Sequence, residues 1–254
     1  MKKIKKAFGI LRDQGLKKFF QKLGDFFVIQ VKKIRKIQQR IYFFFWKKSI
    51  IKKIQTIDTN NPTVMQDVLK KQFLGVFNPQ QVSSEFKRLL KIVVEKKPKI
   101  ILEIGTANGG SLFSWCKLLS LDATIISVDL PAGDFGGGYP EWKIPFYNAF
   151  TKKGQALYLV RADSHKIETV EQVKKILNGN MLDFLFIDGD HTYEGVKKDF
   201  ELFSPFVKKG GFVAFHDVAI HPAELDCFVH YFWVEIQKEY RDKTEEIIEN
   251  QKQG

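Results

Sequence analysis

The segment 99–111, KIILEIGTANGGS, constrains the fold of this chain more than any other. Apolar residues lead to the acidic Glu103, a glycine-rich turn runs from Gly105 to Gly109, and an apolar segment begins at Leu112. This order predicts a buried strand, a tight loop and the start of a helix. Glycines let the backbone approach a ligand closely, and a helix N-terminus offers free N–H groups. We therefore expect a nucleotide-like ligand here.

From Lys99 onward, short apolar segments alternate with amphipathic ones. This alternation is typical of a parallel sheet covered by helices on both faces. We therefore predict an α/β fold with a doubly wound, mainly parallel Rossmann-like sheet. The predicted strands are 100–104, 124–129, 156–161, 182–188 and 211–215, and the predicted helices between them are 111–119, 165–177 and 193–203.

The composition divides the chain into three parts. Residues 1–57 form a basic, amphipathic helical segment that precedes the sheet. Residues 58–98 form a linker of irregular chain and a lead-in helix from about Ser83 to Lys96, which Pro98 ends. Residues 99–254 form the α/β domain.

The residues at the strand ends indicate the ligand, because a doubly wound sheet binds its ligand across the carboxyl ends of the strands. Asp129 ends the second strand, where a carboxylate can accept hydrogen bonds from ribose hydroxyls. Asp163 follows the third strand and can meet an adenine amino group. The fourth strand leads into 188–195, DGDHTYEG, and the fifth ends at His216 and Asp217. These positions predict an adenosine-containing ligand.

The motifs IDGDHTYEG at 187–195 and FHD at 215–217 resemble those of class I S-adenosylmethionine-dependent methyltransferases. Within that class they are similar to bacterial small-molecule and sugar O-methyltransferases of the macrocin O-methyltransferase and cephalosporin hydroxylase neighbourhood. The resemblance covers roughly residues 80–240. It implies that 99–254 is a methyltransferase domain with S-adenosyl-L-methionine as cofactor.

The resemblance also implies roles for single residues. Glu103 and the 105–109 loop would face the amino-acid end of the cofactor, and Asp129 its ribose. Asp163 would lie at the adenine, and Asp188 beside the reacting methyl group. The full set of implied cofactor-binding residues is Glu103, Gly105, Thr106, Ala107, Gly109, Ser111, Asp129, Leu130, Asp163, Ser164 and Asp188.

An NAD-dependent dehydrogenase is the alternative for the first loop, since it shares the strand, glycine turn and helix. However, the spacing of Gly105, Ala107 and Gly109 differs from the dehydrogenase motif G-x-G-x-x-G. Gly110 stands at the last position of that motif, but the match is weak. The motif 188–191 has no role in a dehydrogenase. The methyltransferase interpretation is therefore favoured.

Transfer to a hydroxyl needs a group that removes its proton. His191 is the candidate base, because imidazole titrates near neutral pH, and Asp188 is its candidate catalytic partner. The alternative is that His191 caps the following helix or bonds a loop. The resemblance implies a sugar, a glycan precursor or another small hydroxylated molecule as acceptor. Two non-enzymatic functions remain as alternatives: a catalytically silent cofactor-binding protein and a membrane-surface adaptor with this fold.

Two further groups are candidates for the site. Asp188, His216 and Asp217 come from adjacent strand ends and could hold a divalent ion, Mg²⁺ or Mn²⁺, unless they only line the pocket. Tyr139 and Trp142 lie in the loop 133–142, which we expect to form a lid with these rings as walls of the acceptor site. The alternative is that the two rings simply pack down.

The charge of the chain is concentrated at its N-terminus. Residues 1–55 hold 17 Lys and Arg against two acidic residues, a net charge of +15, whereas the remainder carries −3. Apolar residues recur here at helical spacing, at Phe27, Val31, Ile34, Ile41 and Phe45. The aromatic content favours an anionic membrane surface as partner, with a contact in a homo-oligomer next. Nucleic acid is not expected.

The sequence favours a cytoplasmic protein, peripheral on the inner face of the membrane. Cys116 and Cys227 show no disulfide framework, no signal peptide is evident, and the longest apolar run, 41–46, is too short to span a bilayer. At the other end, 244–249 is the candidate sixth strand. No apolar segment follows it for a seventh strand, so either the sheet is shortened or the sequence is truncated.

Overall fold

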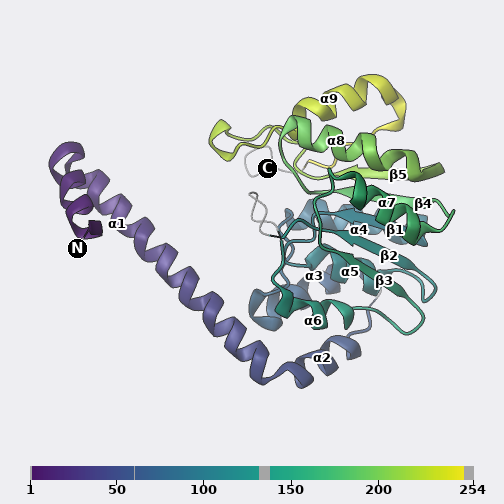
Figure 1. The fold of residues 1–254 in the computed structure, drawn as a ribbon, viewed down its shortest axis with the longest axis horizontal. Coiled ribbons are helices and arrows are strands. Elements are labelled where there is room, and N and C mark those ends of the chain that lie inside the picture. Colours follow the sequence, from purple (N-terminus) through teal and green to yellow (C-terminus); the bar gives the residue numbers. More distant parts are fainter. Residues whose placement is uncertain (1, 60, 132–137, 249–254) are drawn as a thin grey trace. The chain divides into compact units, whose positions relative to one another are not determined.

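The computed structural model describes residues 2–59, 61–131 and 138–248 (Figure 1). The chain divides into two compact units, one up to Ile50 and one from Ile51 onward. The first unit consists of α1 (Lys2–Phe45) and the beginning of α2 (Lys47–Thr56). The predicted helical character of the basic segment is therefore confirmed.

A helix that the sequence analysis missed begins the second unit's lead-in. Helix α3 (Pro62–Lys71) lies where irregular chain is predicted. The Asn61 side chain accepts a hydrogen bond from the N–H of Thr63 at 2.9 Å, and Pro62 occupies the first helical position. Asparagine followed by proline is a favourable helix start, because it satisfies a free N–H group and presets the backbone. The Asn61–Pro62 pair was thus the available signal.

The second unit contains a five-stranded parallel sheet, counted over the described residues, in the order β3-β2-β1-β4-β5. This confirms the predicted doubly wound α/β fold. The chain places β2 and β3 on one side of β1 and then β4 and β5 on the other. The strands are β1 (Ile100–Ile104), β2 (Thr124–Val128), β3 (Ala156–Val160), β4 (Leu182–Ile187) and β5 (Val207–Phe215).

Helices connect these strands close to the predicted positions. They precede, join and follow the strands in the order η1 (Phe73–Gly75), α4 (Ser83–Lys96), α5 (Gly110–Leu118), η2 (Glu141–Lys143), α6 (Ile144–Asn148), α7 (Ile167–Leu177), α8 (Tyr193–Phe203), η3 (Ser204–Phe206), η4 (Ala223–Leu225), α9 (Val229–Tyr240) and η5 (Arg241–Lys243).

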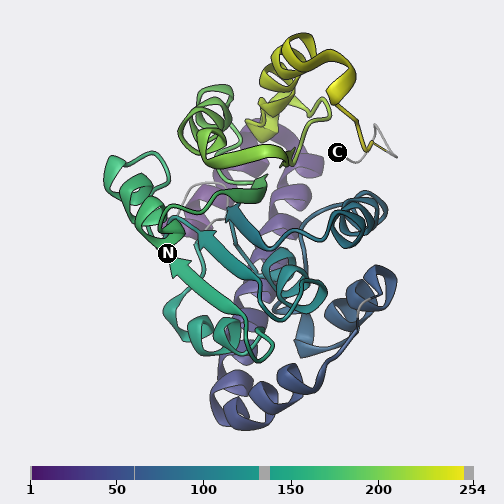
Figure 2. The same ribbon diagram turned by 90° about the vertical axis from the view of Figure 1, so that its right-hand side faces the viewer.

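Helices cover both faces of the sheet (Figure 2). On one face, Leu102 and Ile104 of β1 pack in a buried cluster with α7, α8 and α9. On the other face, Trp115 of α5 contacts Phe184 and Phe186 of β4, with ring centroids 5.5 and 5.7 Å apart. Alternate residues of each strand thus enter opposite layers, which is why the strands read as continuous apolar runs.

The predicted sixth strand is wrong over the described residues. Residues 244–248 form no strand, and Glu249 lies outside the described part of the chain. Instead, Glu246 Oε1 accepts hydrogen bonds from Trp233 Nε1 at 2.5 Å and Gln237 Nε2 at 3.0 Å, both on α9. Side-chain contacts to α9 therefore hold this segment, and β5 is the last strand in the described part of the sheet.

Two further expectations concern the core and the membrane. Cys116 and Cys227 are buried free thiols, as predicted. None of the helices in the described residues combines the length and the apolar content needed to cross a membrane.

The backbone after β1 passes close to the backbone after β4. Gly105 has φ +91°, and a Cβ atom at this position would lie 1.8 Å from the carbonyl oxygen of Asp188. Gly105→Ala is expected to lower the free energy of unfolding by about 3 kcal/mol, because a backbone atom cannot give way. Urea denaturation measures this loss.

Gly179→Ala is the matched control. Gly179 also has a left-handed backbone, with φ +81°, but a Cβ atom at this position would meet nothing within 4 Å. It should lose only about 1 kcal/mol, the cost of the left-handed conformation. Equal losses in the two variants would show that the contact with Asp188 is unimportant.

Candidate functional site

A cavity of about 250 Å³ lies at the carboxyl ends of the strands, where the strand order reverses between β1 and β4. It is lined by the loop after β1, by residues directly following β2, β3 and β4, and by 78–81 of the lead-in segment. This is the position at which doubly wound sheets bind their ligands.

Most of the predicted cofactor-binding residues meet at this cavity. Those that line it are Gly105, Thr106, Ala107, Ser111, Asp129, Leu130, Asp163, Ser164 and Asp188. Four separate strand ends supply them, so the tertiary structure brings together what the sequence spreads over 84 positions, from Gly105 to Asp188. Glu103 and Gly109 do not line the cavity.

Gly109 has a packing role. A Cβ atom here would lie 2.6 Å from the ring of Tyr147, and the backbone is left-handed with φ +82°. The Tyr147 hydroxyl donates a hydrogen bond to the carbonyl of Ala107 at 3.0 Å. Gly109 therefore makes room for the ring that supports the loop, whereas the sequence analysis assigned it to the cofactor.

Glu103 lies beneath the loop and is fully buried. Its Oε1 accepts a hydrogen bond from Trp115 Nε1 at 2.9 Å. Burial raises the pKa of Glu103 to about 8, although hydrogen bonds from Ser111 and Trp115 oppose this rise. The residue thus ties the end of β1 to α5 and does not line the cavity, and its predicted contact with the cofactor stays a prediction.

Asp129 is a buried carboxylate at the end of β2 that lines the cavity. Its two carboxylate oxygens accept N–H bonds from Gly138 at 3.4 Å and from Tyr139 at 3.1 Å. Burial raises its pKa, against these backbone bonds. The N–H groups of Thr106 and Ala107 act on this carboxylate as well, so backbone donors surround it.

Asp163 and Ser164 shape the cavity after β3. Asp163 Oδ1 accepts the N–H bond of His165 at 2.9 Å, which fixes the turn. His165, to which the sequence analysis gave no role, lies with its Nε2 3.2 Å from Oδ1 of the fully buried Asp199. A hydrogen bond to Asp199 raises the pKa of His165. This pair joins the β3 turn to α8.

A second group of side chains, here called the carboxylate–histidine cluster, comprises Asp188, His191, His216 and Asp217. His216 Nδ1 lies 3.0 Å from Asp188 Oδ1 and 3.1 Å from Asp217 Oδ2. His191 bridges the same two carboxylates, with Nε2 3.5 Å from Asp188 and Nδ1 3.3 Å from Asp217. The ends of β4 and β5 thus converge as the sequence predicts.

The structure excludes one alternative for His191. The cap of α8 is Thr192, whose side chain accepts the N–H bond of Gly195 at 3.0 Å. His191 therefore is not the helix cap, and its ring belongs to the cluster. Its backbone carbonyl accepts the N–H bond of Phe228 at 2.8 Å, which holds the loop.

Two residues that contact the carboxylate–histidine cluster were not predicted from the sequence. Gln81 Nε2 donates a hydrogen bond to Asp188 Oδ2 at 2.5 Å, although the two residues are 107 positions apart. His221 Nε2 lies 3.5 Å from Asp217 Oδ1. No sequence signal pointed to Gln81, whereas the spacing of four between Asp217 and His221 was a usable hint.

Charge pairing dominates the electrostatics of the cluster. Burial lowers the pKa of His191 and His216, but the two carboxylates outweigh it, so both values rise, that of His216 well above the ordinary one. Burial opposes ionisation of Asp188, yet both histidines hold its pKa well below the usual range. The cluster thus favours ionised carboxylates paired with protonated imidazoles.

The cluster has the composition of a divalent-metal site. Ligand atoms of Asp188, His216 and Asp217 all lie within 4.8 Å of one another. Carboxylate oxygens with one imidazole suit Mg²⁺ or Mn²⁺, and a cation here would take the place that protons on the imidazoles occupy. His191, Asp217 and Cys227 form a second overlapping group of this kind.

A larger cavity of about 1080 Å³ adjoins the first one. The two share Gln80, Gln81 and His191, and the larger one also reaches His216 and Asp217. Its walls come from α4, β5 and α9. The carboxylate–histidine cluster therefore stands at the junction of two cavities.

Tyr139 and Trp142, predicted as walls of the acceptor site, line neither cavity. The ring of Tyr139 is buried against Tyr147, with centroids 4.8 Å apart. Trp142 meets Phe146 edge-on at 6.2 Å. Both rings pack down, as the alternative interpretation held, and residues 132–137 of the predicted lid lie outside the described residues.

Residues 102–218 match the protein family described as "Methyltransferase domain". The matched region begins in β1 and ends directly after Asp217. It therefore contains the strand ends and loops that form the first cavity and the cluster.

Two curated proteins are similar in sequence, and neither has a described activity. The uncharacterized protein y4gI of Sinorhizobium fredii (strain NBRC 101917 / NGR234) is 29% identical over 143 residues, or 55% of this chain. The uncharacterized protein R132 of Acanthamoeba polyphaga mimivirus is 53% identical over 129 residues, or 48% of this chain. The matches span 15% of the first protein and 53% of the second.

Solved structures with a similar arrangement are more distant in sequence. The O-methyltransferase from Bacillus cereus in complex with SAH is 16% identical, with a TM-score of 0.46, covering 73% of this chain and 82% of that one. The MycE methyltransferase from the mycinamycin biosynthetic pathway, in complex with Mg and SAH, is 14% identical, with a TM-score of 0.46, covering 77% and 48%.

The cluster is expected to bind Mn²⁺, which electron paramagnetic resonance detects directly. Asp217→Asn should weaken this binding at least tenfold, ~1.4 kcal/mol, because it removes an anionic ligand. Asparagine tolerates the left-handed backbone of Asp217, with φ +56°, so the fold should persist.

Asp226→Asn is the control for this measurement. Asp226 is exposed and has a similar backbone, with φ +48°, but it lines neither cavity. It should leave Mn²⁺ affinity unchanged. If Asp217→Asn binds Mn²⁺ as tightly as this control, the cluster is not the metal site.

Proposed function

We propose that this chain, which matches the methyltransferase-domain family over residues 102–218, is an S-adenosyl-L-methionine-dependent O-methyltransferase acting on a small hydroxylated molecule. One observation carries the proposal. The cavity at the strand switch point shares Gln80, Gln81 and His191 with a second, larger cavity, and Asp188 lines the first one beside them. A methyl donor in the first and an acceptor in the second would meet at groups able to accept a proton.

The donor set of the first cavity fits the proposed cofactor. Asp129 and Asp163 both line it, and we assign the Asp129 carboxylate to the ribose hydroxyls and Asp163 to the adenine amino group. The first turn of α5 supplies N–H groups that lack intrahelical partners. S-adenosyl-L-methionine supplies an electrophilic methyl group on a sulfonium, which a hydroxyl oxygen can displace in line. The chain's own task is then to position that oxygen and accept its proton.

His191 is the proposed base. Its ring lines both cavities and contacts both carboxylates of the cluster. Asp188 and Asp217 raise the pKa of His191, so the ring acts as a base at pH values above that pKa, where one nitrogen can take the proton of the acceptor hydroxyl and the two carboxylates stabilise the imidazolium that forms. The same two carboxylates hold the ring in a fixed orientation.

Asp188, His216 and Asp217 are the proposed ligands of a divalent cation, Mg²⁺ or Mn²⁺. Such an ion lowers the pKa of a hydroxyl bound to it. The acceptor proposed from the sequence resemblance is a sugar or a glycan precursor. The larger cavity supports this assignment, because its volume of about 1080 Å³ accommodates more than a single small ring.

The cofactor is tested by calorimetry with S-adenosylhomocysteine. The wild-type chain is expected to bind it, and Asp129→Asn should weaken binding at least tenfold, because hydrogen bonds to a charged acceptor contribute about 1.5–3 kcal/mol. NADH should not bind.

Asp122→Asn is the control in this titration, since Asp122 is exposed and far from the cavity, where it pairs with Lys99. It should bind like the wild type. Failure of the well-folded wild type to bind S-adenosylhomocysteine would refute the methyltransferase proposal, and binding of NADH instead would favour the dehydrogenase.

The base is tested by His191→Ala. This variant should bind S-adenosylhomocysteine normally but lose turnover by roughly 10²–10⁴-fold, the usual contribution of general base catalysis. Turnover is measured as S-adenosylhomocysteine formed with a panel of sugars and phenols in the presence of Mg²⁺.

His230→Ala is the matched histidine control, because His230 lies on α9 and lines neither cavity. It should keep full turnover. Unchanged turnover in His191→Ala would remove this residue from the mechanism. Cofactor binding without turnover on any acceptor in the wild type would favour the catalytically silent alternative.

A further inference from the structure

Helix α1 presents a wide apolar face to solvent. Between Leu23 and Trp46, apolar residues recur every three or four positions, so they share one side of the helix. Phe27, Val31 and Phe45 are 60, 63 and 75% exposed. Phe26, Ile34, Ile37, Ile41 and Phe44 are further exposed apolar side chains of this side, whereas the exposed Val28 and Ile29 lie off it. A surface of this kind in a monomeric protein marks an interaction site.

Basic side chains cover the opposite side. At 100° per residue, Lys32, Lys36 and Arg40 point away from the stripe through Ile34 and Ile41. All three basic side chains are exposed, and within the described residues no ion pair joins them to a carboxylate. This part of α1 is therefore amphipathic, and no carboxylate neutralises these three basic side chains within the described residues.

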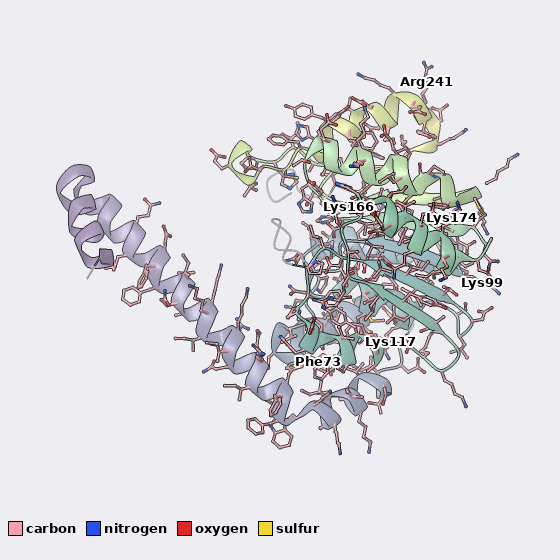
Figure 3. All side chains as sticks on the ribbon, viewed as in Figure 1. Phe73, Lys99, Lys117, Lys166, Lys174 and Arg241 are labelled. Carbon is pink, nitrogen blue, oxygen red and sulfur yellow. The ribbon has the colours of Figure 1, made fainter. Side chains whose placement is uncertain are left out.

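The second unit differs in this respect. Lys99 and Lys174 lie on its outside (Figure 3), and each has an acidic neighbour. Lys99 Nζ lies 2.6 Å from Asp122, and Lys174 Nζ lies 3.6 Å from Glu171. The excess positive charge of the chain is thus confined to the N-terminal segment, where residues 1–55 carry +15.

Aromatic residues gather where α1 ends. Four exposed aromatic side chains lie here: Tyr42 (42% exposed), Phe44 (77%), Phe45 (75%) and Trp46 (58%). The ring centroids of Phe44 and Phe45 are 5.4 Å apart. Tyrosine and tryptophan rings are favoured at the boundary between lipid chains and water, because they combine an apolar body with a polar group. This end of α1 therefore suits the headgroup region of a bilayer.

We propose that α1 binds in the plane of an anionic lipid bilayer, with its apolar face in the interface and its lysines and arginines toward the lipid phosphates. Such a helix lies on a membrane and does not span it, which agrees with the absence of any candidate span among the described helices. The inference is independent of the proposed methyl transfer.

Charge complementarity selects the bilayer over the other occupants of this face. A second copy of α1 would bring another strongly positive segment alongside the first, whereas an anionic leaflet attracts it by about 1 kcal/mol per basic residue near the surface. Nucleic acid would neutralise the lysines but leave the exposed phenylalanines and isoleucines in water.

The experiment is cosedimentation of the full chain with phosphatidylcholine vesicles that contain or lack phosphatidylglycerol. The wild type should bind only the anionic vesicles and dissociate in high salt. Two triple variants should each lower the partition coefficient at least tenfold: Phe27→Gln with Ile34→Gln and Ile41→Gln, and Lys32→Gln with Lys36→Gln and Arg40→Gln.

The matched control carries the same charge change on the second unit, as Lys153→Gln, Lys175→Gln and Lys209→Gln, three exposed lysines. It should bind anionic vesicles like the wild type. Binding of S-adenosylhomocysteine or, failing that, circular dichroism confirms that each variant is folded. Vesicle binding that survives both α1 variants overturns the proposal.

Two other outcomes would also overturn it. If a second copy covers the face, the wild type should not bind vesicles, and sedimentation equilibrium without lipid should show a dimer. Only the apolar variant should disrupt that dimer. RNA binding lost in the lysine variant, again with no vesicle binding, would assign the segment to nucleic acid.

Discussion

The contact between the ends of β1 and β4 underlies the rest of the second unit. The chain reverses its direction of sheet building here, so the two strand ends must lie side by side while their loops diverge. Gly105 permits this, because any side chain would meet the carbonyl of Asp188. Gly105 and Asp188 both line the cavity, and Asp188 is also a member of the cluster, so this contact connects the two.

The carboxylate–histidine cluster follows from that arrangement. Once β4 and β5 pair in parallel, Asp188 and Asp217 lie at the same edge of the sheet, and two buried or half-buried carboxylates need compensating charge. His191 and His216 supply it, each within 3.5 Å of both carboxylates. A divalent cation would meet the same requirement. The same side chains thus compensate the charge at this edge of the sheet and supply the groups that a methyl transfer would use.

Local sequence was sufficient for much of this. The strand bounds of β1 and the helix bounds of α8 agree with the prediction, because a continuous apolar run and a 3.6-residue period report burial directly. Asp129, Asp163 and Asp188 were predicted to meet at one edge of the sheet because each lies shortly after a strand, and all three line the cavity. Gln81 was not predicted, since its contact with Asp188 depends on how the lead-in segment packs across the strand ends. Residues 244–248 were misjudged because Glu246 bonds to α9, a contact that no local pattern records.

The sequence by itself determined the alternation of strands and helices, the strand-end acidic residues and the concentration of positive charge before residue 56. These are local properties, fixed by periodicity and composition. Only the tertiary structure decided which glycine serves the backbone approach and which serves a ring, that Glu103 lies beneath the cavity, and that Tyr139 packs inward. The physical reason is that a side chain's role depends on what occupies the space next to it, and parallel strands bring distant parts of the chain into that space.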